Sequence, residues 1–136
     1  VPEVMVIHMA LALRELQLSS QNSPLIFCGD FNVKPGDAPY LLATEGALDP
    51  SNEHYPPRVP DDRWQPKVEY GMRSAYKEAL GAEPAVTNWA FTRGSDQDFK
   101  DCLDYIFVSK GVDVEAVLPL DGAATAQGPF PNAEEP

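Results

Sequence analysis

The chain has 136 residues, 43% of them hydrophobic, which suffices for one domain with its own core and is too short for two. Ten Lys and Arg against 21 Asp and Glu give a net charge of −11, which argues against broad, sequence-independent electrostatic binding to nucleic acid. This charge does not exclude a nuclease whose metal ions and a few local bases contact the phosphates.

The cysteines and the apolar runs indicate the compartment. Cys28 and Cys102 both lie in apolar, strand-like runs, so we expect two buried free thiols in a reducing environment. The apolar run over residues 4–13 lacks the features of a signal peptide and is too short to span a bilayer. We therefore expect a soluble intracellular protein, cytoplasmic or nuclear, with no membrane partner.

The first predicted element is a helix over residues 2–18, because Pro2 suits a first helical turn and Glu3 favours its positive end. Apolar residues at helical spacing predict its buried face: Val4, Ile7, Leu11 and Leu18. Gln17 is expected on the solvent side.

Residues 25–28 then predict a short buried strand that ends in Gly-Asp-Phe-Asn. Asp30 and Asn32 are two residues apart, so in a continuing strand they share a face. A carboxylate beside a group that can donate suits a phosphate with a metal and an attacking water. The alternative is an Asx-type strand end, in which both side chains only satisfy turn amides.

The middle of the chain alternates helix and loop. Asp37 is a predicted N-cap for a helix over residues 40–45, which Gly46 ends. Residues 51–70 form a Pro-rich acidic loop, and a helical turn or two over residues 74–80 follows. A strand, a loop and a helix in this order predict an α/β fold.

The last third predicts strands over residues 86–92, 102–108 and 112–118, with a polar turn at 93–98. Asp104 shares its strand face with Ile106 and Val108, and a carboxylate on an apolar face is costly unless it has a partner. An ordinary strand-end Asp that caps a loop is the alternative to a specific cationic or His partner. Neither His8 nor His54 is an obvious candidate, so a His partner is expected outside these residues.

Three segments together resemble the exonuclease–endonuclease–phosphatase superfamily, and within it the deadenylases of the carbon catabolite repressor type, with nocturnin and Angel proteins as relatives. They are Gly-Asp-Phe-Asn at 29–32, Thr-Asn-Trp at 87–89 and Phe-Lys-Asp-Cys-Leu-Asp-Tyr-Ile-Phe at 99–107. Gly-Asp-Phe-Asn alone is a weak signal, but the later Leu-Asp-Tyr-Ile-Phe makes the combination specific. The resemblance implies that residues 1–136 are the C-terminal part of one four-layered α/β sandwich, with two packed sheets flanked by helices.

The resemblance also implies Mg²⁺, with Mn²⁺ as the alternative, and roles for individual residues. Asp30 would orient or deprotonate the attacking water and contact the metal through water, and Asn32 would hydrogen-bond the scissile phosphate. Asp104 would hold a catalytic His in its productive tautomer. Asn88 and Phe99 would contact the adenine nucleotide across a connection lengthened by residues 93–96.

Other parts of the family's site have no counterpart here. The metal-binding Glu is expected upstream, and residues 118–136 resemble the lead-in to a Ser-Asp-His motif, so we expect a fragment that is inactive alone. The leading hypothesis is a Mg²⁺-dependent 3′-exoribonuclease that acts on poly(A), with RNA 3′ ends or adenine nucleotides as ligands and deadenylase-complex proteins as partners. The alternatives are a 2′,5′-phosphodiesterase, a nucleotide phosphatase, or a catalytically dead interaction module, which the acidic loop would suit.

Overall fold

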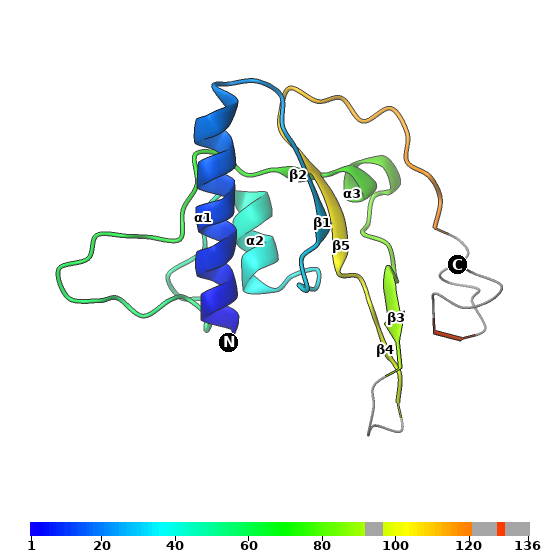
Figure 1. The fold of residues 1–136 in the computed structure, drawn as a ribbon, viewed down its shortest axis with the longest axis horizontal. Helices are drawn as coiled ribbons and strands as arrows, with labels where there is room; N and C mark the ends of the chain where they lie inside the picture. The colour runs from blue at the N-terminus through cyan, green and yellow to red at the C-terminus, as the bar shows by residue number, and fades with distance from the viewer. Residues whose placement is uncertain (92–96, 121–127, 130–136) are drawn as a thin grey trace.

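The computed structural model describes residues 1–91, 97–120 and 128–129. Along these ranges the elements are α1 (Pro2–Ser20), β1 (Ile26–Asp30), α2 (Ala38–Glu45), β2 (Arg73–Ser74), α3 (Ala75–Leu80), β3 (Asn88–Ala90), β4 (Phe99–Asp101) and β5 (Asp104–Val108). This combination of helices with antiparallel sheets confirms the predicted α/β class (Figure 1). Its place in a four-layered sandwich stays a prediction for the complete domain.

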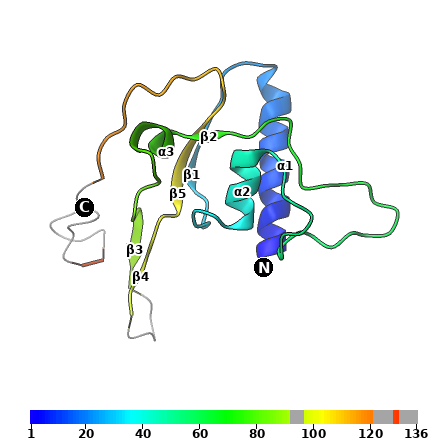
Figure 2. The same cartoon turned by 180° about the vertical axis from the view of Figure 1, so that it is seen from behind.

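The strands form two antiparallel sheets. The central sheet has the order β1-β5-β2, and β3 pairs with β4 in a separate two-stranded ribbon. Helices α1 and α2 lie on one side of the central sheet, and the β3–β4 ribbon projects beyond the beginning of β5, as both views show (Figures 1 and 2). The ribbon therefore starts next to the end of the sheet at which β1 stops.

The hydrophobic core fills the space between the helices and the sheet. Leu13 of α1, Leu42 of α2 and Phe107 of β5 are among its fully buried side chains. The rings of Tyr105 and Phe107 stack with their centroids 5.1 Å apart, and Phe31 meets Phe107 at 5.4 Å. Burial of such apolar surface is the main favourable contribution to folding, so this face anchors both long strands.

The buried face of α1 differs from the predicted one. Three of the four predicted core residues are exposed: Val4, Leu11 and Leu18. The helix buries a different set instead: Val6, Met9, Ala10, Leu13 and Gln17. Both sets keep helical spacing, and the helix is apolar on several sides, so spacing alone does not select the face. Gln17 is buried, contrary to prediction, because its side-chain amide donates to the Tyr70 carbonyl (2.8 Å) and accepts from the Glu69 N–H (2.9 Å).

Strand β1 is covered on one face only, so the prediction of a fully buried strand is wrong. Phe27 packs against the core, whereas Ile26 is 60% exposed and Cys28 is also exposed. Cys102 is buried as predicted. The error has a simple cause: a run of apolar residues gives no alternation from which an exposed face could be recognised.

The structure divides the last third of the chain differently from the prediction. The predicted strand over residues 102–108 begins at Asp104, and a separate β4 precedes it. Of the strand predicted over 86–92, β3 occupies Asn88–Ala90, and residue 92 lies outside the described residues. The strand predicted over 112–118 is wrong, since residues 109–120 are irregular throughout. Within this segment the Val112 carbonyl accepts a hydrogen bond from the Arg73 guanidinium rather than from a neighbouring strand.

The remaining elements follow the prediction. Helix α2 begins after Asp37 and ends at Gly46, which has φ +83°, and α3 is capped by the Ser74 side chain and ends at Gly81. Residues 51–70 are loop apart from one isolated bridge, with Pro56 and Pro66 buried. The middle of this loop projects away from α1 (Figure 1), and its end at Glu69 and Tyr70 is hydrogen-bonded to Gln17. None of the helices in the described ranges is long and apolar enough to cross a membrane.

Candidate active site

The two predicted catalytic carboxylates lie on neighbouring strands at one end of the central sheet. In the antiparallel register of β1 and β5, Asp30 lies directly opposite Asp104, so both side chains belong to the same sheet face. Like charges directly opposite each other destabilise a strand pair unless a cation or a proton offsets them. The sheet therefore presents a pair of carboxylates that suits a cationic partner.

Asn32 reaches this end of the sheet by a turn. Strand β1 ends at Asp30, and Asn32 has φ +50°, in the left-handed region, so the prediction that both residues share one strand face is wrong. The backbone N–H of Asn32 donates to Asp30 Oδ1 over 2.8 Å, which is the Asx-turn geometry of the alternative. This turn leaves the Asn32 side chain exposed, and it borders a hollow beside the start of α1 rather than the one that Asp104 lines.

Two buried or half-buried hydroxyl groups fix the segments that carry these residues. The Tyr105 hydroxyl lies 2.8 Å from the Val33 carbonyl oxygen and 3.1 Å from that of Cys102, and it ties the turn after β1 to the start of β5. The Thr87 hydroxyl accepts from the backbone N–H groups of Leu103 (2.9 Å) and Asp104 (3.0 Å). Burial raises the pKa of Tyr105 far above its ordinary value, so the phenol stays a donor.

The exposed face of the sheet borders a hollow of about 420 Å³. Asp104 lines it together with Cys28, Ile106 and Thr87, and Tyr76 of α3 also contributes. Its walls are mostly apolar, and Asp104 is the one predicted site residue that lines it. Asp30, Asn32, Asn88 and Phe99 lie outside it.

The predicted substrate residues lie on the β3–β4 ribbon. Asn88 pairs with Asp101 and Ala90 with Phe99, so Asn88 and Phe99 share one face of the ribbon. The ammonium of Lys34, two residues after Asn32, lies 5.4 Å from the centre of the Phe99 ring and 2.6 Å from Asp101 Oδ2. The structure thus brings Phe99 next to the turn that carries Asn32.

Lys34 and Asp101 are neighbours of the predicted site residues that the sequence reasoning missed. Each belongs to a segment that the motifs had marked, but nothing in the sequence pairs residues 67 positions apart. A cationic residue just after the Gly-Asp-Phe-Asn run was the available signal.

The side chains available as ligands determine which metal ion these residues could hold. The described residues contain no group of three or more His, Cys, Asp and Glu side chains arranged to hold a metal ion. They do supply the oxygen pair of Asp30 and Asp104. Mg²⁺ prefers oxygen ligands, keeps several waters and is often bound through one or two carboxylates, so this pair fits Mg²⁺ as a partial site. In the described residues no Lys, Arg or His forms an ion pair with Asp104, and its predicted His partner stays a prediction.

Comparison with known proteins identifies the family of this chain. The profile of the Endonuclease/Exonuclease/phosphatase family matches residues 3–125. The chain belongs to this family.

The similar curated proteins act on phosphodiester bonds, as their names state. A 2′,5′-phosphodiesterase 12 of Homo sapiens is 32% identical over 122 residues, which cover 86% of this chain and 19% of the relative. The CCR4-Not complex 3′-5′-exoribonuclease subunit Ccr4 of Aspergillus oryzae is 37% identical over 101 residues, which cover 74% of this chain and 13% of the relative. The chain therefore spans less than a fifth of the length of these relatives.

Proposed function

We propose that these residues form the C-terminal part of the catalytic domain of a metal-dependent phosphodiesterase, with a 3′-exoribonuclease acting on poly(A) as the leading activity. The observation that carries the proposal is the pairing of Asp30 with Asp104 at the end of the sheet, beside the Asn32 turn, in a member of the family. Catalytic power would come from positioned charge at one sheet end, which rigid strands supply.

Each residue has a distinct role in the proposed reaction. Asp30 accepts a proton of the attacking water or orients that water toward phosphorus, and the Asn32 amide donates to a phosphate oxygen. As the new P–O bond forms, the bond from phosphorus to the leaving ester oxygen breaks, and that oxygen takes a proton from solvent. Asp104 orients a catalytic His by accepting its N–H, as the acidic member of a His–Asp pair does. Mg²⁺, when bound beside Asp30, supplies neutralisation of phosphate charge.

Substrate contacts would come from the β3–β4 ribbon. The Phe99 ring offers a face on which a base can stack, and the Asn88 side chain can both donate and accept hydrogen bonds to a base edge. These groups share one ribbon face, which is the arrangement that single-stranded ligands need. Adenine is the base that we propose, by analogy with deadenylases.

A 2′,5′-phosphodiesterase is the second candidate, because the relative of that name matches the larger share of this chain. The experiment is hydrolysis by the complete protein of poly(A), 2′,5′-linked oligoadenylate and NADPH side by side, with Mg²⁺, with Mn²⁺ and with excess chelator. We expect metal-dependent release of adenylate from poly(A). Faster cleavage of the 2′,5′-linked substrate would transfer the assignment to the second candidate, and preference for NADPH would indicate a nucleotide phosphatase.

A catalytically dead interaction module is the alternative from a different class. The protein would then bind protein partners through acidic surfaces such as the Pro-rich loop, and it would hydrolyse none of the three substrates in any metal. Retention of Asp30, Asn32 and Asp104 favours the enzyme. We also propose an intracellular location and association with deadenylase-complex proteins, to be tested by purification of the complete protein with its partners.

A further inference from the structure

The turn after β1 and the β3–β4 ribbon are joined by one side chain. Lys34 Nζ lies 2.6 Å from Asp101 Oδ2, and the same ammonium lies 5.4 Å from the centre of the Phe99 ring. The link crosses between the segment that carries Asn32 and the ribbon that carries the proposed base-stacking residue.

Both partners of this link are held in place by the backbone. Asp101 Oδ1 accepts the N–H of Cys102 over 3.0 Å, which leaves Oδ2 for the lysine. On the other side, Asp37 Oδ2 accepts the backbone N–H of Lys34 over 2.9 Å, and the Lys34 carbonyl accepts from Asp37 N–H at 3.1 Å. The hydrogen bond and charge of Asp101 raise the pKa of Lys34, so the side chain is a fixed cation.

The Lys34 ammonium has N–H donors that Asp101 does not use. A lysine carries three N–H donors, and Asp101 takes one of them. Half of the Lys34 side chain is exposed, at 50%, so the other donors are accessible to a ligand. Because the ammonium lies over one face of the Phe99 ring, a base would stack on the other face, with its phosphate directed toward Lys34.

The negative charge of the residues around the site would repel a polyanionic ligand, so binding of such a ligand requires a cation there. Asp30, Asp37, Asp101 and Asp104 are all acidic residues of the segments that form this end. Lys100 does not offset them, because its ammonium lies 3.7 Å from the centre of the Trp89 ring on the opposite face of the ribbon. A phosphodiester approaching Asp30 would meet these carboxylates and the neutral Asn32 amide, and Lys34 adds a cationic side chain to this set.

We propose that Lys34 is a substrate-phosphate contact, and that Asp101 is the positioning residue that holds its ammonium over Phe99. The ligand is the phosphate of a single-stranded oligonucleotide whose base lies on Phe99. This inference rests on the proposed function and adds to it a phosphate-binding group outside the sequence motifs.

The test uses the complete protein and measures KM and kcat for oligoadenylate at several salt concentrations. Lys34→Met is expected to raise KM about tenfold, since hydrogen bonds to charged groups contribute roughly that factor, with little change in kcat. It is also expected to lower the slope of log KM against log salt by about 0.7, the value for one phosphate contact on a single strand. Lys34→Arg is expected to restore the slope.

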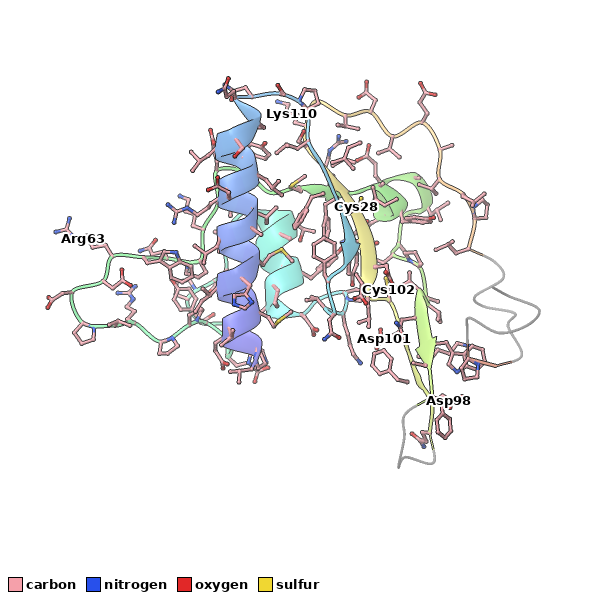
Figure 3. All side chains as sticks on the ribbon, viewed as in Figure 1. Cys28, Arg63, Asp98, Asp101, Cys102 and Lys110 are labelled. Atoms are coloured by element: carbon pink, nitrogen blue, oxygen red, sulfur yellow. The ribbon has the colours of Figure 1, made fainter. Side chains whose placement is uncertain are left out.

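Lys110→Met is the matched control, because Lys110 is exposed and lies beyond the opposite end of β5 from Asp101 (Figure 3). It is expected to leave both KM and the slope unchanged. Asp101→Asn is expected to raise KM while keeping the slope, since the cation remains but is less well placed. Thermal unfolding of each variant checks that the fold is intact.

Two results would overturn the inference in different ways. If the wild-type protein binds and cleaves oligoadenylate and Lys34→Met leaves KM and the slope unchanged, Lys34 is only a link between the turn and the ribbon. An equal loss of kcat in Lys34→Met and Asp101→Asn without a change in slope would lead to the same conclusion. If the wild-type protein neither binds nor cleaves the oligonucleotide, the proposed function fails, and this inference fails with it.

Discussion

The Tyr105 hydroxyl offers the sharpest test of how the site is held together. It is buried and lies within hydrogen-bonding distance of the Val33 and Cys102 carbonyl oxygens, so it joins the segment after Asn32 to the segment before Asp104. Replacing Tyr105 with Phe removes this single group and keeps the ring.

The structure sets the expected cost. The ring keeps its contacts with Phe107, at 5.1 Å, and with Tyr40, at 5.4 Å, so no cavity forms. What is lost is a buried hydrogen bond, which leaves carbonyl oxygens without this donor and costs about 1–3 kcal/mol. We expect Tyr105→Phe to lower the free energy of unfolding by about 2 kcal/mol.

The assay is urea unfolding of the complete protein, in which the midpoint should fall with an unchanged m-value. Tyr76→Phe is the matched control, because its hydroxyl donates to the Leu118 carbonyl over 2.9 Å at an exposed position where water can replace it. The control should stay within about 0.5 kcal/mol of the wild type. Equal stability of the two variants would show that the buried hydrogen bond of the Tyr105 hydroxyl does not hold these two segments together.

Three further predictions concern packing, thiol chemistry and the ribbon. Gly71→Ala should destabilise the fold by about 1–3 kcal/mol or more, because a Cβ there would lie 2.1 Å from a backbone oxygen of α2. In Gly81→Ala the new Cβ meets no atom within 4 Å, so this control should cost only the strain of a left-handed backbone, about 1 kcal/mol. Urea unfolding compares the stability of the two variants. Cys28 should react with a thiol reagent in the native protein, and Cys102 only after unfolding, because burial excludes the reagent and raises the pKa of the Cys102 thiol. A mass spectrum of the labelled peptides measures the labelling of each cysteine. Equal labelling of the two would contradict the burial of Cys102. Thr87→Val should lower the free energy of unfolding by about 1–3 kcal/mol and reduce kcat as well, because two consecutive backbone N–H groups lose their acceptor. Thr87→Ser keeps the hydroxyl and should retain both stability and kcat.

The sequence predicts well those features that local chemistry determines. Helix α2 begins at the predicted position after Asp37, although the Asp37 side chain accepts the N–H of Lys34 and not a helix N–H, and Gly46 ends it. The two halves of the carboxylate pair follow from the motifs around Asp30 and Asp104. Each of these depends on residues within a few positions of one another or on a motif specific enough to be recognised.

Features that depend on which surfaces pack against each other are harder to predict from the sequence. The exposed face of β1 and the buried face of α1 are decided by what packs on them, and apolar residues on several sides leave that choice open. The strand predicted over 112–118 fails for a related reason, because an alternating pattern becomes a strand only beside a partner edge. The pairing of Lys34 with Asp101 likewise requires the three-dimensional contact between the turn and the ribbon.

The most direct test of the proposed catalytic function is Asp30→Asn in the complete protein, measured by single-turnover hydrolysis of oligoadenylate with Mg²⁺. The Asn side chain can keep the hydrogen bond from the Asn32 N–H, so the turn survives and only the charge and basicity are lost. Asp49→Asn is the matched control, since Asp49 Oδ1 accepts the N–H of Ser51 over 2.8 Å in a similar exposed turn away from the carboxylate pair. We predict a fall in rate of about 10²–10⁴-fold for Asp30→Asn with an unchanged unfolding midpoint, and wild-type rates for the control. A near-normal rate for Asp30→Asn would contradict this prediction.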